Sequence, residues 1–208
     1  MIDTTTLVTY VAVVLGLFLV PGPAVLLTLA RATTGGRRIG VATGLGIAAG
    51  DCVHTAMATF GLSAVLMTSA VAFEIVKFAG AAYLVLLGIR ALFERTGKVQ
   101  LSPSRFLDAP RAFRQGVLAE VLNPKTALFF LAFLPQFVRP GHGFIVGQFA
   151  LLGLIFVGMS AVYTSLLALA AGQASRWLGR HGRIRHWQGR ITGTIFIALG
   201  IRLALEER

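Results

Sequence analysis

Charged side chains are rare within the apolar segments of this sequence, and Asp51 and Lys125 are the two whose positions suggest chemistry. If the segment that contains Asp51 enters a membrane near Gly40, the rise of a helix places its carboxyl group about 16 Å deep. Lys125 lies about 13 Å deep if its segment enters near Gly116. A lone Asp or Lys at the bilayer centre costs roughly 2.5–3.5 kcal/mol. We therefore expect these two residues to form a pair or to share a wet cavity.

Two proline motifs interrupt apolar segments of membrane length, at Pro21-Gly22-Pro23 and at Asn123-Pro124-Lys125. A proline removes one backbone hydrogen bond from a helix, and the carbonyl groups expected to lose a partner here are those of Leu17, Leu19 and Glu120. Broken helices are tolerated at membrane depth only where they line a protein cavity. The two motifs therefore predict a binding site inside a membrane protein.

The residue types at these breaks suggest what the site binds. Asn123 and Pro124 are typical of a helix start, and Pro23 would begin a second half-helix in the same way. Such half-helices direct unpaired N–H groups and a positive dipole end toward the break, while the freed carbonyls could accept hydrogen bonds from an ammonium group. Gly22 would let the backbone approach a ligand closely. With Asp51 as an anion and Lys125 as a cation, the set matches a small zwitterion such as an amino acid.

Three acidic or basic side chains near the breaks receive separate interpretations. Asp51 is expected to take up and release a proton as Lys125 or the substrate approaches and leaves; the alternative is an Asp51–Lys125 pair that only holds helices together. Glu120 lies one turn before Asn123 and is a candidate for a gate or a cytoplasmic vestibule. His54 lies one turn from Asp51 and is a second gate candidate. For His54 we favour a hydrogen-bonded packing role over a metal site, because no third or fourth metal ligand shows clear spacing.

The composition indicates an all-α integral membrane protein. Of the 208 residues, 56% are hydrophobic and 13% are charged, which is far from an ordinary soluble domain. Three of the six apolar runs exceed the roughly 20 residues that cross a bilayer. We predict a single transmembrane domain over residues 1–208 with six helices, at about Leu7–Ala30, Gly40–Met67, Ile75–Leu92, Gly116–Leu134, Phe144–Ala171 and Gly189–Ala204.

The net charge of +11 is unevenly distributed between the expected loops. Fourteen Lys and Arg residues follow the first, third and fifth spans, and three lie on the opposite side. This positive-inside bias predicts odd-numbered loops in the cytoplasm and both termini outside. The arginines are explained as topology signals that also contact lipid, so nucleic acid is not expected as a partner.

The two halves of the chain share features. Leu87-Gly88-Ile89-Arg90 closes the third span and Leu199-Gly200-Ile201-Arg202 closes the sixth, and each half has its proline motif in its first span. Because each half has an odd number of spans, the halves must be inverted across the membrane. We predict two inverted three-helix repeats, at about 1–95 and 112–208, with a cytoplasmic loop at about 93–115. Paired interruptions in inverted halves indicate a transporter site near the midplane.

The same motifs make the chain resemble the LysE-type exporters, the lysine-exporter and homoserine/threonine-resistance translocators of bacteria. The resemblance covers nearly the whole chain and includes, besides the two proline motifs and Asp51, positions Gly40, Gly44, Gly46, Gly50, Lys77, Gly80, Ala81, Tyr83, Leu84, Gly88, Phe113, Gly116 and Phe133-Leu134-Pro135-Gln136-Phe137. It implies a six-helix inner-membrane exporter of amino acids or related small metabolites, driven by the proton or membrane gradient. It does not identify the substrate, and no cofactor is expected.

Other functions stay open at this point. A divalent-metal exporter of related architecture would need a cluster of carboxylate, His or Cys ligands at membrane depth, where only Asp51, His54 and Glu120 are available. A passive channel would differ from a transporter in failing to move substrate against its gradient. An intramembrane enzyme is not expected, because a single midplane Asp does not supply the residue pair of an aspartyl protease. A homo-oligomer is compatible with the sequence.

Overall fold

The computed structural model describes residues 2–19, 22–68, 108–139 and 143–171, with isolated positions between 71 and 93 and between 194 and 205. The third and sixth expected spans, the two Leu-Gly-Ile-Arg motifs and the expected cytoplasmic loop therefore lie largely outside the described residues, as does Pro21. The described residues are helical or lie in short connections, without a strand among them. The all-α class is confirmed for this part of the chain.

The first bent span consists of α1 (Thr4–Leu19) and α2 (Pro23–Gly35). The two helices are bent by 57° across the first proline motif. Asp3 starts α1, because its carboxylate accepts hydrogen bonds from the Thr6 backbone N–H at 2.8 Å and from the Thr6 hydroxyl at 2.9 Å. These bonds, together with the Arg139 guanidinium at 3.2 Å, hold the pKa of Asp3 below its ordinary value. The cap of α1 is therefore ionised at neutral pH.

The chain turns at Gly36, whose φ of +84° favours glycine, and runs back as α3 (Arg37–Met57). A π-helical turn, η1 (Ala58–Leu62), joins α3 to α4 (Ser63–Thr68) without a break. The expected second span is thus a continuous helix over residues 37–68.

The second bent span begins with α6 (Ala109–Val121) and continues after the Asn123 break as α7 (Pro124–Leu128), the π-helical turn η2 (Phe129–Phe133) and the 3-10 turn η3 (Leu134–Phe137). The bend at the break is 45°. The straight helix α8 (Ile145–Leu169) follows.

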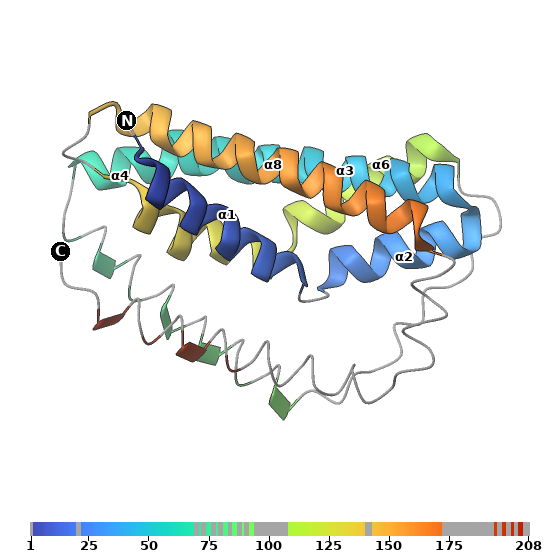
Figure 1. Ribbon diagram of the computed structural model, residues 1–208, viewed down its shortest axis with the longest axis horizontal. Coiled ribbons are helices and arrows are strands. Elements are labelled where there is room, and N and C mark those ends of the chain that lie inside the picture. Colours follow the sequence, from blue (N-terminus) through green and yellow to red (C-terminus); the bar gives the residue numbers. More distant parts are fainter. Residues whose placement is uncertain are drawn as a thin grey trace.

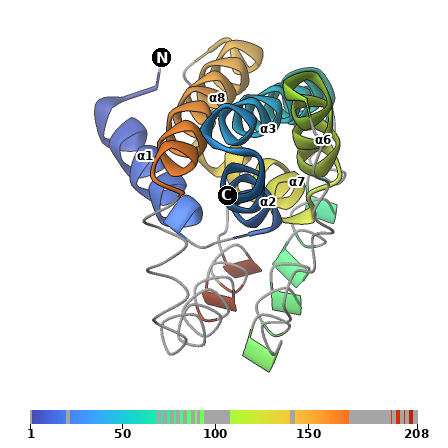
Figure 2. The ribbon, with the colours of Figure 1, turned by 90° about the vertical axis from the view of Figure 1, so that its right-hand side faces the viewer.

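Helix α3 lies at the centre of the described helices. Viewed end-on, it sits between α6 and α8, and α2 packs along it (Figure 2). The α2–α3 turn, the start of α6 and the end of α8 lie at one end of the molecule, whereas the N-terminus, α4 and the start of α8 lie at the other (Figure 1). The bent pair α1–α2 and helix α8 therefore run in one direction, and α3 and the bent pair that begins with α6 run in the other (Figure 1).

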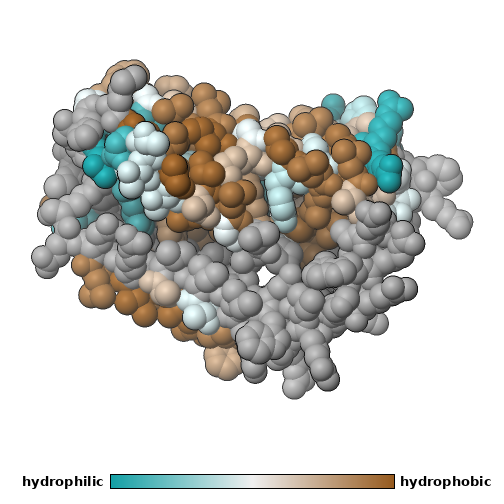
Figure 3. Space-filling view, viewed as in Figure 1, coloured by the Kyte–Doolittle hydropathy of each residue, from teal (hydrophilic) through white to brown (hydrophobic). Residues whose placement is uncertain are grey.

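The apolar character of the helices matches the composition. Among the described residues, α8 is the one straight helix long and apolar enough to cross a membrane, and three such segments result if each bent pair counts as one span. Helix α3 is less apolar, since glycines, threonines, Asp51 and His54 lie on its buried side. Large apolar side chains such as Phe60, Leu154 and Val162 are exposed, and hydrophilic residues gather toward the two ends of the face in Figure 3.

Two glycines allow α3 and α6 to pack backbone against backbone. A Cβ atom added at Gly46 would lie 2.1 Å from the carbonyl oxygen of Phe113, and one at Gly116 would lie 2.3 Å from the carbonyl oxygen of Thr43. Backbone oxygens of packed helices cannot rotate away as a flexible side chain can. Any larger residue at either position must therefore push the helices apart.

Gly46→Ala and Gly116→Ala are each expected to reduce the free energy of unfolding by roughly 1–3 kcal/mol, because overpacking forces a backbone shift. Thermal unfolding of the purified protein in detergent would measure the loss. Gly158→Ala in α8 is the matched control, because no atom lies within 4 Å of the added Cβ, and its Tm should equal or exceed that of the wild type. A wild-type Tm for Gly46→Ala would contradict the close approach of α3 and α6.

Candidate functional site

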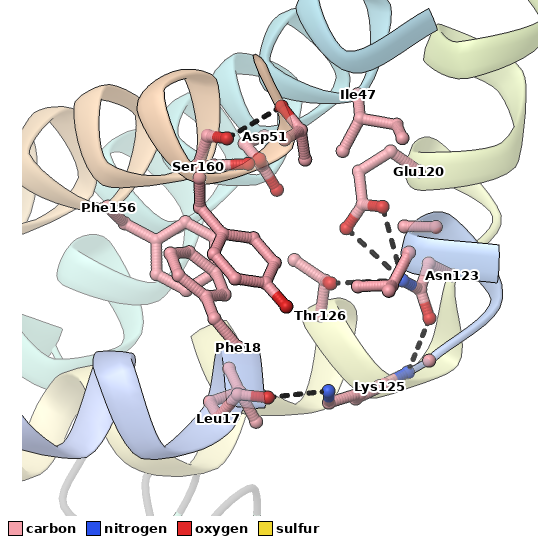
Figure 4. Close-up of a pocket in the computed structure, with 15 residues that line it drawn as sticks. Leu17, Phe18, Ile47, Asp51, Glu120, Asn123, Lys125, Thr126, Phe156 and Ser160 are labelled. Atoms are coloured by element: carbon pink, nitrogen blue, oxygen red, sulfur yellow. Dashed lines mark hydrogen bonds between the residues drawn. The ribbon is translucent and has the colours of Figure 1, made fainter. Parts of the chain in front are cut away.

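A cavity of about 40 Å³ lies where the two bent spans meet α3 and α8 (Figure 4). This volume holds a few water molecules. The residues that line the cavity include Gly22 of the first proline motif, Asn123 and Lys125 of the second, and the buried acids Asp51 and Glu120. The two breaks and the buried carboxyl groups therefore converge at one cavity.

Lys125 connects the two breaks. Its Nζ donates a hydrogen bond of 2.8 Å to the carbonyl oxygen of Leu17, the same carbonyl that the missing N–H of Pro21 cannot serve. The Lys125 side chain passes over Gly22, where an added Cβ would lie 3.3 Å from its Cδ and 3.6 Å from its Nζ. The ammonium group thus replaces the lost backbone donor, and the glycine leaves space for it to do so.

The second break has its own replacement donor. The Glu120 carbonyl, which Pro124 cannot serve, accepts hydrogen bonds from the Asn123 N–H and from His54 Nε2, both at 2.9 Å. Because a carbonyl only accepts, the Nε2 of His54 must carry a hydrogen. The imidazole also stacks on Phe130, with the ring centroids 5.7 Å apart. His54 is buried, does not line the cavity, and has the hydrogen-bonded packing role that the sequence favoured.

Asn123 fixes both the start of α7 and the orientation of Glu120. Its Oδ1 accepts a hydrogen bond from the Lys125 backbone N–H at 3.1 Å, and its Nδ2 lies 3.2 Å from each carboxylate oxygen of Glu120. Glu120 is 2% exposed and faces the cavity, whereas the sequence suggested a cytoplasmic vestibule. Its position depends on Gly50, since a Cβ there would lie 2.6 Å from the Glu120 Cβ.

Asp51 lacks a hydrogen-bond donor. Its side chain is 1% exposed, and both carboxylate oxygens are buried without a hydrogen-bond partner among the described residues. Glu120 and Ser160 lie beside it in the cavity wall (Figure 4). Of the two arrangements expected for Asp51 and Lys125, the structure has a shared cavity and not a direct pair.

The two half-helix starts at the breaks differ in how well they are capped. At α7, the Asn123 side chain caps the helix. At α2, the N-cap residue is Gly22, which has no side chain that could accept a hydrogen bond. The start of this helix therefore has no side-chain cap. The first-turn N–H groups of α2 therefore face the break, where Ala24 and Val25 line the cavity. The positive end of α2 and the Lys125 ammonium group lie at the same point.

Pro23 and Pro124 act through the backbone alone. Each is the first residue of its helix, α2 or α7, and neither lines the cavity. Pro21 lies outside the described residues. Pro23 and Pro124 thus begin the two helices, and the contacts to the cavity come from their neighbours.

An aromatic wall that the sequence analysis missed faces these polar groups. The Phe18 ring stacks on Tyr163 at a centroid distance of 5.3 Å and meets Phe156 edge-on at 5.2 Å; all three residues line the cavity. Phe156, Ser160 and Tyr163 follow one another at intervals of four and three residues, which places them on one face of α8. That periodicity is the signal that could have found them.

Comparisons with known proteins give a consistent result over nearly the whole chain. A family model described as LysE type translocator matches residues 15–207. An uncharacterized membrane protein of Pseudomonas aeruginosa is 31% identical, covering 94% of this chain and 93% of that protein. The homoserine/homoserine lactone efflux protein of Salmonella typhimurium is 29% identical over 90% of both chains. The leucine efflux protein of the same organism is 26% identical, over 94% of this chain and 93% of its own.

No solved structure matches this chain. The family model nevertheless covers the end of α1, all of α2 and the whole of the second bent span, and the relatives align along almost their full lengths. The chain belongs to the LysE type translocator family.

Proposed function

We propose that this translocator is a secondary-active exporter of amino acids or closely related small metabolites across the bacterial inner membrane. The observation that carries the proposal is the convergence, in one cavity, of an uncapped helix start, the Lys125 ammonium group and the unpartnered Asp51 carboxyl group. These groups offer a positive site and a negative site to one small ligand. The names of the relatives, which refer to efflux of leucine and of homoserine, support the substrate class and the direction.

The arrangement of the cavity suggests how an amino acid binds. Its carboxylate would lie at the start of α2, where the Lys125 ammonium group adds a charge-assisted hydrogen bond. Its ammonium group would lie at Asp51, because the Leu17 and Glu120 carbonyls already accept hydrogen bonds from Lys125 and His54. This differs from the sequence expectation that the freed carbonyls bind the ammonium group. The side chain of the substrate would face the aromatic wall.

Binding requires movement, since the cavity now holds only a few water molecules. The Lys125–Leu17 hydrogen bond crosses the cavity wall between the two bent spans (Figure 4), and a substrate carboxylate would compete with Leu17 for the same ammonium group. The two bent spans run in opposite directions (Figure 1), which supports the proposed inverted repeat. Rocking of one repeat against the other would then open the site to each side in turn.

Efflux from proteoliposomes tests the proposal. Proteoliposomes that hold the same concentration of labelled L-leucine or L-homoserine inside and outside should export the amino acid, against the concentration gradient that then develops, when a proton gradient is imposed. Asp51→Asn should lower this rate at least about tenfold, because a charge-assisted contact contributes about 1.5–3 kcal/mol. Asp108→Asn is the matched control, because Asp108 caps α6 outside the cavity and Asn caps equally well.

Two outcomes of the efflux assay would contradict the proposal. Movement of amino acids only down their own gradient would indicate a passive channel. Gradient-driven release of divalent metal ions, with no movement of amino acids, would indicate a metal exporter.

Lys125→Met is expected to remove the preference of the transporter for an amino acid over its amide. The amide lacks the negative carboxylate that Lys125 would bind, so the half-saturating concentration of leucine should rise roughly 10–100-fold while that of leucinamide changes little. Competition of each compound with labelled efflux measures both values. Lys125→Arg keeps the charge and should keep the preference; a wild-type preference in Lys125→Met would place the carboxylate elsewhere.

The proposed orientation has both termini outside, and the arginines of the described ends support it. Arg31, Arg37 and Arg38 flank the α2–α3 turn, and Arg111 and Arg114 lie in the first turns of α6 at the same end (Figure 1). Basic residues favour the cytoplasmic side of a membrane.

Single cysteines would test this orientation in intact cells. In a Cys52→Ala background, Thr5→Cys should react with a membrane-impermeant maleimide from outside, and Thr34→Cys should react only after the cells are opened. Both positions are exposed. The reverse pattern of labelling would show that the termini lie in the cytoplasm.

A further inference from the structure

We infer that a second cavity binds one acyl chain of a membrane phospholipid, from the leaflet nearer the N-terminal end of the molecule. This lateral cavity has a volume of about 410 Å³, whereas the cavity between the two bent spans has about 40 Å³. Its walls come from α3, η1 and α4 on one side and from α7 and η2 on the other. The inference does not depend on what the protein transports.

The lateral cavity extends along the helices that form it. On the first wall its lining residues run from His54 to Val65, which corresponds to about 16 Å at the rise of a helix. His54 lies one turn beyond Asp51, and Val65 belongs to α4 at the N-terminal end of the molecule (Figure 1). One leaflet of a hydrocarbon core roughly 30 Å thick measures about 15 Å. The length of the cavity therefore matches the depth of one leaflet.

The rim of the lateral cavity is exposed at membrane depth. Met57 and Leu131 line the cavity and are 54% and 39% exposed. Each lies six residues beyond the charged residue of its span, Asp51 or Lys125, and therefore about 9 Å nearer the N-terminal end. Exposed apolar side chains in the membrane-spanning part of a protein face hydrocarbon and not water. The cavity thus opens to the acyl chains of the bilayer.

The walls favour an apolar ligand that carries its polar group elsewhere. Large apolar cavities remain dry and bind apolar molecules. Among the described residues that line the cavity, His54 is the one polar side chain, and its Nε2 already donates to the Glu120 carbonyl at 2.9 Å. A free fatty acid would find no Lys or Arg for its carboxylate in these walls. A phospholipid needs none, because its head group stays at the membrane surface.

The acyl chain would pack against the side chains that support the second break. His54 stacks on Phe130 at a centroid distance of 5.7 Å, and both residues line the lateral cavity. The same imidazole serves the carbonyl of Glu120, whose side chain lines the cavity between the two bent spans. A chain that fills the lateral cavity is therefore expected to stabilise the fold around the break.

Gly61 allows the lateral cavity to be filled without a clash. It lines the cavity, and a Cβ atom added to it would have no atom within 4 Å. Gly61→Phe therefore places a ring in the space proposed for the acyl chain. Gly158→Phe in α8 is the matched control, because its added Cβ also meets no atom within 4 Å and Gly158 does not line the cavity.

Photo-labelling in liposomes tests the inference. The lipid would be phosphatidylethanolamine with a diazirine at the end of one acyl chain, and mass spectrometry would locate the label after digestion. The wild type should carry label on Leu62 and Phe130, which are buried cavity residues that surface lipid does not reach. Gly61→Phe should lower this labelling at least about tenfold, because close packing excludes the chain. Labelling of the exposed Val8 in α1 should be equal in the wild type and both variants.

Thermal unfolding gives a second measurement and shows that the variants are folded. Phosphatidylethanolamine added to delipidated protein in detergent should raise the Tm of the wild type and of Gly158→Phe. It should raise the Tm of Gly61→Phe less, because the ring already fills the cavity. An equal rise in all three proteins would overturn the inference.

The labelling experiment distinguishes the other occupants. Label on exposed residues alone, or label on Phe130 that Gly61→Phe does not lower, would show that no lipid chain enters the cavity. In a Cys52→Ala background, a disulfide between two copies of Gly61→Cys, with Phe130 unlabelled in the wild type, would show an interface between copies. Stronger labelling of Phe130 by a diazirine fatty acid than by the phospholipid would assign the cavity to a free fatty acid. Each of these results would overturn the proposal.

Discussion

A helix that loses a backbone hydrogen bond inside a membrane must obtain a donor from elsewhere, and the centre of this protein depends on two such replacements. Lys125 of α7 serves the Leu17 carbonyl of α1, and His54 of α3 serves the Glu120 carbonyl of α6. Each donor comes from a different helix than the carbonyl it serves. A local defect in the backbone thereby becomes a contact between helices, and the broken segments are fixed at the wall of the cavity.

The packing of α3 sets the chemistry of this cavity. Gly46 and Gly50 of α3 bring α6 so close that Glu120 of α6 reaches the level of Asp51. Asp51 follows Gly50 directly in α3. Two carboxyl groups in one cavity repel each other when both are ionised, so the close packing that stabilises the helix pair also shapes the electrostatics of the cavity. The residue that packs α3 on α6 and the residue that lines the cavity are therefore adjacent in α3, at Gly50 and Asp51.

The sequence predicted those features that depend on local chemistry. The start of a helix at Pro124, the cap by Asn123 and the loss of a partner at Leu17 and Glu120 follow from proline and asparagine alone. The choice of replacement donor could not be predicted, because Lys125 and Leu17 are 108 positions apart in the chain. The aromatic wall was missed for a related reason: Phe18 and Tyr163 meet only through the packing of α1 on α8.

The two π-helical turns, η1 and η2, contact each other at the side of the cavity nearer the N-terminal end of the molecule. A π turn holds about one residue more than an α turn, so the side chains beyond it are rotated by about 100° relative to an unbroken α-helix. Residues from Ser63 onward and from Leu134 onward thus face neighbours that counting from Asp51 or Lys125 would not assign. In relatives, the gain or loss of a single residue within Ala58–Leu62 would turn the outer end of that helix to a new face while the cavity kept its register.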